Sequence, residues 1–143
     1  MKFWDTSALL PLCLEEAHTK IMKKIINDDE SMVVWWGSLV EGYSAIARLK
    51  REGVLDLVAE RQVYNLLKVL SSGWIEVEPS NEVRQLALRL LRLHNLRAAD
   101  ALQLAAALVW VEKSPADQGF VSLDFRLREA AQNEGFSVLP AEL

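Results

Sequence analysis

Near its start the chain reads Lys2-Phe3-Trp4-Asp5-Thr6-Ser7-Ala8-Leu9-Leu10, where a short apolar run ends at an acid and a helical pattern follows. The same order returns at Phe120-Val121-Ser122-Leu123-Asp124. Short apolar runs of this kind are typical of buried strands, and open α/β sheets bind ligands outside the carboxyl ends of their strands. The two stretches therefore predict an α/β fold with Asp5 and Asp124 at a ligand-binding edge of the sheet.

Short β-rich runs alternate with longer helical ones along the chain, which is typical of an α/β domain with a mainly parallel sheet. The expected strands cover residues 2–4, 32–36, 74–77, 120–123 and 137–139. Apolar periodicity predicts helices over residues 18–26, 39–51, 55–70, 81–93 and 101–111. The last of these is apolar almost all round after Gln103, so we expect it to be the buried central helix.

Length and charge exclude several classes of protein. A chain of 143 residues can bury one core without disulfides or structural metal, and we expect a single domain over residues 1–143. The net charge of -4 argues against binding nucleic acid through bulk electrostatics, so any such contact must be local. A hydrophobic share of 51% lies at the apolar end of normal and is consistent with a covering partner or a homodimer.

The N-terminal sequence and the single cysteine favour a cytoplasmic protein. Asp5 precedes any long apolar region, so no signal peptide is expected, and no apolar stretch approaches the length of a membrane span. Cys13 lies between Leu12 and Leu14 and cannot form an internal disulfide. We expect it to be a buried structural thiol in a reducing compartment.

Acidic residues recur where helices are expected to begin, at Asp5, Glu41, Asp100 and Asp124. Each one alone has an ordinary structural explanation, because Asp is a favoured N-cap residue. Ser38-Leu39-Val40-Glu41 matches a capping box, and the segment from Asp100 to Gln103 resembles a variant of it. Helix capping is therefore the alternative to a functional site at every one of these positions.

Taken together, the acids point to a metal site. Asp5, Asp100 and Asp124 have apolar neighbours, and partial burial of an unpaired carboxylate is costly. Oxygen-only ligands favour Mg²⁺ or Mn²⁺ over zinc, and His18 and His94 lack a second histidine or a cysteine at ligand spacing. No phosphate-binding glycine loop is present. The hydroxyls of Thr6, Ser7 and Ser122 are expected to support the acids by hydrogen bonds.

At these residues the chain resembles the PIN-domain family of metal-dependent ribonucleases, and more closely its VapC-type toxin branch. The opening from Asp5 to Leu9 resembles the first family motif, and the helix around Glu41 resembles the second. Arg97-Ala98-Ala99-Asp100-Ala101-Leu102-Gln103-Leu104-Ala105 resembles the third, and Val121-Ser122-Leu123-Asp124 the fourth. One departure is Ser122, where the family often has Thr; the hydroxyl is kept.

The resemblance implies a three-layer α/β/α fold in which the four acids meet around one or two Mg²⁺ or Mn²⁺ ions. It implies an endoribonuclease, with Asp5 and Asp100 as principal ligands and Asp124 completing a second metal position. Glu41 would bind through water or orient the nucleophile. A toxin of this kind also implies a cognate antitoxin protein as partner, a homodimer, and an RNA substrate whose identity the motifs do not encode.

Two other hypotheses remain open on the sequence. The first is a non-catalytic PIN-like module that binds RNA or protein and keeps the acids for folding. The second is a phosphoryl-transfer domain, which is disfavoured because Asp5-Thr6-Ser7 lacks a second acid two residues on. Five basic residues could steer RNA phosphates toward the acids, or they could simply lie on solvated faces of helices. They are Arg48, Lys50, Arg51, Arg92 and Arg97.

Overall fold

The computed structural model describes residues 1–143 and contains one sheet of five parallel strands, in the order β3-β2-β1-β4-β5. The first strand therefore lies at the centre, with Phe3 paired to Val33 on one side and to Phe120 on the other. The strand bounds are β1 Lys2–Trp4, β2 Met32–Trp35, β3 Ile75–Val77, β4 Gly119–Val121 and β5 Ser137–Leu139.

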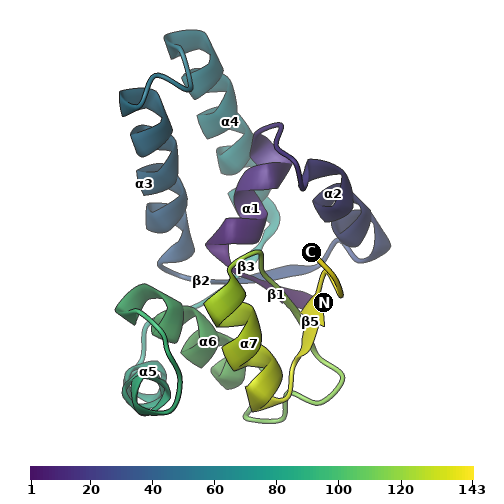
Figure 1. Cartoon of the computed structure of the whole chain (residues 1–143), viewed down its shortest axis with the longest axis vertical. Coiled ribbons are helices and arrows are strands. Elements are labelled where there is room, and N and C mark those ends of the chain that lie inside the picture. Colours follow the sequence, from purple (N-terminus) through teal and green to yellow (C-terminus); the bar gives the residue numbers. More distant parts are fainter.

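Seven helices cover both faces of the sheet, which confirms the predicted three-layer α/β/α arrangement (Figure 1). One face carries α5, α6 and α7, and the other carries α1 and α2. The helix bounds are α1 Thr6–Cys13, α2 Thr19–Asp28, α3 Ser38–Arg51, α4 Leu57–Gly73, α5 Asn81–Leu93, α6 Ala98–Trp110 and α7 Phe125–Glu134. None of these helices is both long and apolar enough to cross a bilayer.

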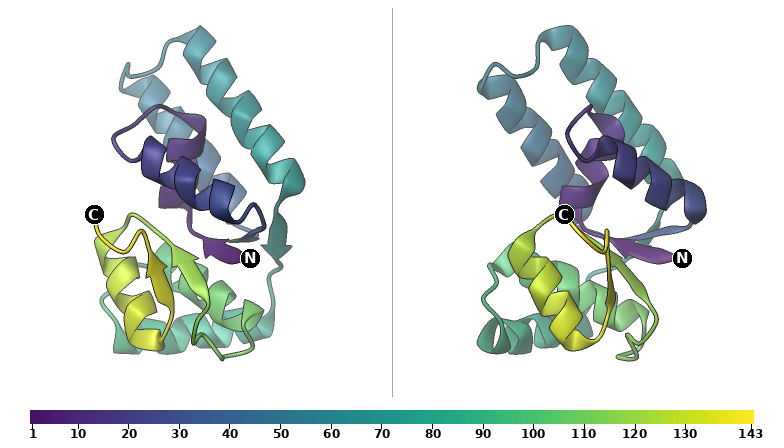
Figure 2. Two further views of the ribbon diagram at one scale, coloured as in Figure 1. Left: turned by 90° about the vertical axis from the view of Figure 1, so that its right-hand side faces the viewer. Right: turned by 45° about the vertical axis from the view of Figure 1, so that its right-hand side comes forward.

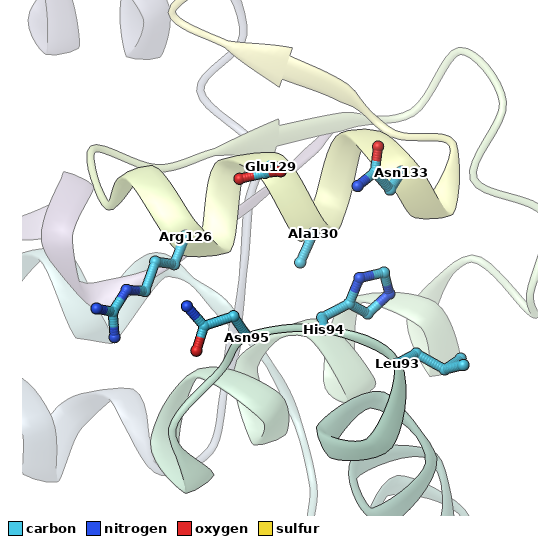
Figure 3. Close-up of a pocket in the computed structure, with 7 residues that line it drawn as sticks. All are labelled: Leu93, His94, Asn95, Arg126, Glu129, Ala130 and Asn133. Carbon is cyan, nitrogen blue, oxygen red and sulfur yellow. The ribbon is translucent and has the colours of Figure 1, made fainter.

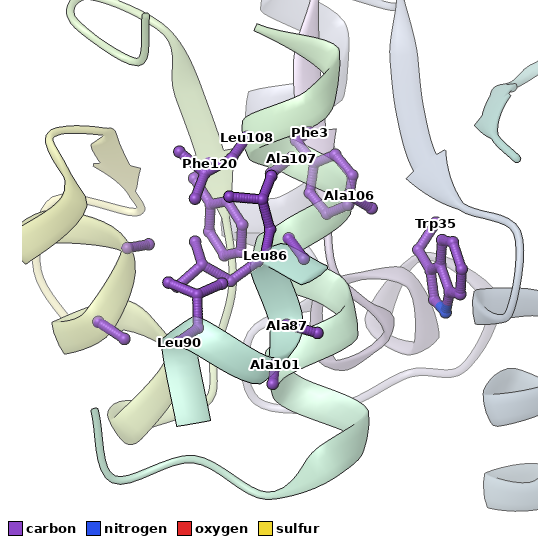
Figure 4. Packing of buried hydrophobic residues seen from close by; sticks show 14 of the residues in the cluster. Phe3, Trp35, Leu86, Ala87, Leu90, Ala101, Ala106, Ala107, Leu108 and Phe120 are labelled. Carbon is purple, nitrogen blue, oxygen red and sulfur yellow. The ribbon is translucent and has the colours of Figure 1, made fainter. Parts of the chain in front are cut away.

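Alternation along the strands divides the core between the two faces, because successive side chains of a strand point to opposite sides. Phe3 and Phe120 lie in the larger core with α6, whereas Trp4 and Val121 lie in the core on the opposite face. The Phe3 and Phe120 rings stack with centroids 5.4 Å apart, beside the alanine-rich surface of α6 (Figure 4). The small side chains of α6 let that helix lie close against the sheet, and its predicted central burial is confirmed.

The α3 and α4 helices form a hairpin that projects beyond the sheet and packs against α1 (Figure 2). A Cβ added at Gly42 would lie 3.0 Å from a methyl group of Leu67, so glycine allows close packing of the two helices. The predicted stop at Gly53 is also confirmed, since this residue adopts φ +77° just after α3. This hairpin has its own small core, which contains Cys13, Ile46 and Leu67.

The element boundaries differ from the sequence predictions by a few residues at most places. The two strands at Lys2–Trp4 and Ser137–Leu139 and the helix at Asn81–Leu93 match. The largest difference for the site is that β4 ends at Val121, two residues earlier than expected, because Ser122 and Leu123 form a connection rather than a strand. Asp124 therefore follows a short loop and not the strand itself.

Candidate active site

The four acids all lie at helix N-termini that open toward the carboxyl edge of the sheet. Asp5 and Asp124 are the N-cap residues of α1 and α7, while Glu41 and Asp100 lie in the first turns of α3 and α6. Unpaired N–H groups and the helix dipole favour negative charge at this position. The four acids lie close together because the four helices that carry them begin around the same space.

Asp5 is the most deeply buried acid, with 2% of its surface exposed. Its carboxylate accepts hydrogen bonds from the Ser7 backbone N–H and from the Ser122 hydroxyl. Burial raises the pKa of Asp5 to about 6, while these hydrogen bonds lower it and the nearby charge of Asp124 raises it further. The Ser122 hydroxyl thus donates to Asp5 directly, whereas the Ser7 hydroxyl accepts from the Leu123 backbone N–H at 2.9 Å.

Glu41 is held by the side chain of Gln103, which reaches it from α6. Gln103 Nε2 lies 3.1 Å from Glu41 Oε1 and 3.2 Å from Oε2, and it also reaches the hydroxyls of Thr6 at 3.1 Å and Ser38 at 2.9 Å. Burial raises the pKa of Glu41, against the lowering effect of the Gln103 and Thr6 hydrogen bonds. Thr6 is thus also tied to the acid cluster.

The predicted capping box at Ser38 and Glu41 is wrong. The helix begins one residue earlier than the motif requires, so Gly37 is the N-cap and Ser38 is already helical. The Ser38 hydroxyl is fully buried and accepts from Gln103 instead of from the helix backbone. Glu41 is therefore free of a capping role and faces the other acids.

The capping variant expected at Asp100 is wrong for a similar reason. The N-cap of α6 is Arg97, and Asp100 stands three residues into the first turn. Burial raises the pKa of Asp100, the charge of Asp124 raises it further, and the Arg97 backbone hydrogen bond and the charges of Arg97 and Arg126 lower it. The charge of Asp100 therefore interacts both with the more buried Glu41 and with Asp124.

Asp124 confirms the capping interpretation, because its Oδ1 accepts from the Leu127 backbone N–H at 2.9 Å. It also lines, together with Asp100, a surface hollow of about 480 Å³. The other residues of this hollow, which we call the acid hollow, are Arg97, Ala99, Phe125 and Arg126. Two carboxylates and two guanidinium groups therefore share one solvent-accessible space.

The donor set fits a hard divalent cation by its chemistry. All four side chains offer carboxylate oxygens, and none of them forms an ion pair within 4.0 Å of a protein cation. Mutual repulsion contributes to the raised pKa values of Asp5, Glu41 and Asp100. No three acidic, histidine or cysteine side chains have the geometry to hold one ion together. Mg²⁺ needs only one or two protein carboxylates, because water completes its coordination shell.

Two residues at this site were not predicted from the sequence as site residues. Gln103 is buried at 2% exposure and joins Thr6, Ser38 and Glu41. The signal was a single amide inside an otherwise apolar helix, one turn after Asp100. Phe125 is exposed to 78%, which is unusual for a phenylalanine, and no pattern in the sequence distinguished it from a core residue.

Comparison of the sequence with models of protein families identifies the family of the chain. The family model of the PIN domain matches residues 2–133, which is nearly the whole chain. The chain belongs to the PIN domain family. The predicted resemblance is confirmed at the family level, and no curated protein sequence is significantly similar to this PIN domain.

Solved structures agree with this PIN fold. FitAcB from Neisseria gonorrhoeae aligns with a TM-score of 0.65 at 12% identity, covering 99% of this chain and 98% of that one. PAE2754 from Pyrobaculum aerophilum aligns with a TM-score of 0.63 at 22% identity, covering 96% and 88%. A toxin–antitoxin complex from Klebsiella pneumoniae contains a chain that aligns with a TM-score of 0.62 at 14% identity, covering 87% of each. At these identities the comparison establishes the fold.

Proposed function

We propose that this PIN domain is a Mg²⁺- or Mn²⁺-dependent endoribonuclease and the toxin of a toxin–antitoxin pair. The observation that carries the proposal is the cluster of Asp5, Glu41, Asp100 and Asp124, none of which forms an ion pair with a protein cation within 4.0 Å. PIN domains are in general nucleases, and one similar structure is a toxin–antitoxin complex from Klebsiella pneumoniae.

In this proposal Asp5 and Asp100 are the principal metal ligands and Asp124 completes a second position. A bound divalent ion would supply charge neutralisation at the phosphoryl oxygens and lower the pKa of a water molecule. Arg97 and Arg126, which line the acid hollow, would hold the RNA phosphate against the carboxylates. Arginine guanidinium groups suit this task because they pair with two phosphate oxygens at once.

Glu41 would orient the attacking water or accept its proton. Its carboxylate is fixed by the Gln103 amide, and the burial that raises its pKa makes it a stronger base than a solvated glutamate. Phosphodiester hydrolysis then places the water hydroxyl on phosphorus and releases the ribose oxygen, which takes a proton. The fixed position of Glu41 serves this step because general bases must lie within hydrogen-bond reach of the proton.

Cleavage of total bacterial RNA by the purified chain tests the proposal. We expect discrete cuts with Mg²⁺ or Mn²⁺, none in EDTA, and none by Asp100→Asn in either condition. Asp117→Asn is the matched control, because Asp117 is an exposed acid of the turn at the opposite end of β4. Equal cutting by the wild type and Asp100→Asn would contradict the assignment of the site, and absence of cuts would favour a non-catalytic RNA-binding or protein-interaction module.

The surface of α3 and α4 supports the proposed protein partners. Large apolar side chains are exposed along this hairpin: Val40, Tyr43, Val58, Leu66 and Val69, each at 41% or more. Exposed large apolar side chains that gather on one element are typical of protein interaction sites. We propose that an antitoxin covers them, and that homodimerisation adds a second interface.

Co-expression with the protein encoded beside this gene tests the first partner, and light scattering tests the second. We expect a stable complex that suppresses RNA cleavage, and a solution mass of two chains without the antitoxin. The double variant Val58→Lys with Val69→Lys should lose one of the two associations while retaining the fold, since both side chains are exposed. We also propose a cytoplasmic location, in keeping with the free, buried thiol of Cys13.

A further inference from the structure

A second hollow lies beside the acid hollow, between the loop that joins α5 to α6 and the outer surface of α7. Its volume is about 160 Å³, and its lining is mostly polar (Figure 3). We call it the amide pocket, and it is formed by Leu93, His94, Asn95, Arg126, Glu129, Ala130 and Asn133. In Figure 3, His94 and Asn95 lie on the loop that faces α7, and Ala130 points from α7 toward this loop.

The geometry points to this pocket as a binding site for one unpaired nucleotide of the RNA, next to the nucleotide whose phosphate lies at the acids. The inference rests on the proposed ribonuclease function, which it deepens by naming a substrate subsite. Single-stranded RNA is recognised through splayed-out bases that hydrogen-bond to side chains along their edges. A polar surface pocket beside the proposed phosphate-binding arginines meets this requirement.

Hydrogen-bonding capacity in the pocket is unused by the protein itself. His94 is engaged, with its Nε2 2.7 Å from Glu134 Oε2, and this contact ties the loop to the end of α7. The side chains of Asn95, Arg126 and Asn133 make no hydrogen bond within the chain although they line one pocket. Each Asn amide offers both donors and an acceptor, which is the mixture that a base edge presents.

Arg126 connects the two hollows, because its side chain lines both of them. A phosphate bound at Arg126 would therefore lie between a base in the amide pocket and the carboxylates of Asp100 and Asp124. Glu129 at the same pocket disfavours a phosphate inside it, and its carboxylate would instead accept from the amino or ring N–H groups of a base. The pocket is thus suited to the base and Arg126 to the phosphate.

A further hollow adjoins the amide pocket on the side of α5. Leu93 lines both the amide pocket and this hollow, which it forms with Arg89 and Arg92. Residues 83–99 contain Arg84, Arg89, Arg92 and Arg97 and no acid, although the whole chain carries a net charge of -4. A strand of RNA would therefore meet cations on both sides of the amide pocket. By contrast, Arg48, Lys50 and Arg51 lie in the last turn of α3, at the opposite end of that helix from Glu41.

Binding of RNA to a chain that cannot cleave it tests the subsite separately from catalysis. The parent protein is Asp100→Asn in EDTA, and the probe is a short fluorescein-labelled single-stranded RNA of mixed sequence. We expect the added double change Asn95→Ala with Asn133→Ala to weaken binding roughly tenfold, as two lost hydrogen bonds would. Gln132→Ala is the matched control, because Gln132 is an exposed amide on α7 outside the pocket and should leave the affinity unchanged.

Side-chain amide signals in NMR spectra provide the second measurement, with nucleoside 5′-monophosphates as probes. We expect the Asn95 and Asn133 signals to shift with the nucleotides and to stay in place with inorganic phosphate alone. Signals that do not move, together with unchanged RNA affinity of the double variant, would overturn the subsite even if the wild type cleaves RNA. Shifted signals in a chain that never cleaves RNA would retain the subsite and reject the nuclease.

Discussion

The amide of Gln103 and the carboxylate of Glu41 are joined by contacts of 3.1 and 3.2 Å between Nε2 and the two carboxylate oxygens. This pair connects α6 to α3 across the edge of the sheet. The same amide nitrogen lies near Thr6 and Ser38, so one side chain joins three elements that carry or flank the proposed metal ligands. Gln103 is therefore a positioning residue for Glu41.

Gln103→Ala should destabilise the chain and impair catalysis more than the loss of stability explains. Removing the amide leaves the partly buried Glu41 carboxylate with only the longer 3.4 Å contact from the Thr6 hydroxyl, at a cost of about 1–3 kcal/mol in the free energy of unfolding. Urea denaturation and RNA cleavage below the unfolding temperature measure the two effects. Gln85→Ala, at an exposed helical position, is the control; cleavage by Gln103→Ala at the wild-type rate would contradict the positioning role.

Asp5 makes the stability of the metal-free protein fall as pH rises from about 4 to about 6. The folded chain holds a proton on Asp5 up to a pKa of about 6, whereas an aspartate in the unfolded chain, with its ordinary pKa of 3.8, has already lost it. The folded state thus binds more protons in this window, and the difference amounts to about 3 kcal/mol. Denaturation in EDTA at several pH values should show this loss.

Asp5→Asn should reduce this pH dependence to the part that the raised pKa values of Glu41 and Asp100 contribute, and make the metal-free chain more stable than the wild type at pH 7. Asparagine keeps the N-cap of α1, since its side-chain oxygen also accepts from a backbone N–H. A wild-type protein whose stability rises between pH 4 and pH 6 in EDTA, or an Asp5→Asn variant that follows the same curve as the wild type, would contradict the assigned burial of charge.

Mg²⁺ or Mn²⁺ should raise the thermal unfolding temperature of the wild type. An ion that binds the folded chain at about 100 times its dissociation constant stabilises it by about 2.7 kcal/mol. The shift should be lost in Asp100→Asn and kept in Asp117→Asn, as monitored by calorimetry with Ca²⁺-free buffers. No shift in the wild type would indicate that the four acids do not form a metal site.

Phe125→Leu should weaken RNA binding while leaving stability within about 0.5 kcal/mol of the wild type, since the side chain contributes little to the core. The exposed ring lines the acid hollow and offers a surface on which a base can stack, an interaction of about 1–3 kcal/mol per base. Phe125→Trp should keep the affinity because it keeps an aromatic ring. Equal RNA affinity of the Leu and Trp variants would exclude stacking at this position.

The sequence predicted the architecture well because the relevant signals are local. Apolar runs and helical periodicity identified every strand, and Asn81–Leu93 and Ser137–Leu139 were predicted to the residue. The caps at Asp5 and Asp124 were also predictable, since a capping side chain bonds a backbone N–H two or three residues ahead. The errors at Glu41 and Asp100 arose where a capping motif was present but the helix started at Ser38 or Ala98 instead.

Local patterns in the sequence were enough to identify an α/β PIN domain with an acid at the start of each of four helices. Which hydroxyl or amide contacts which acid became visible only in the folded chain. The contact from Ser122 to Asp5 joins residues 117 positions apart, and that from Gln103 to Glu41 joins residues 62 apart. Such contacts depend on the parallel strand order, which brings the ends of distant strands and the starts of distant helices to one edge, and no short-range pattern encodes that distance.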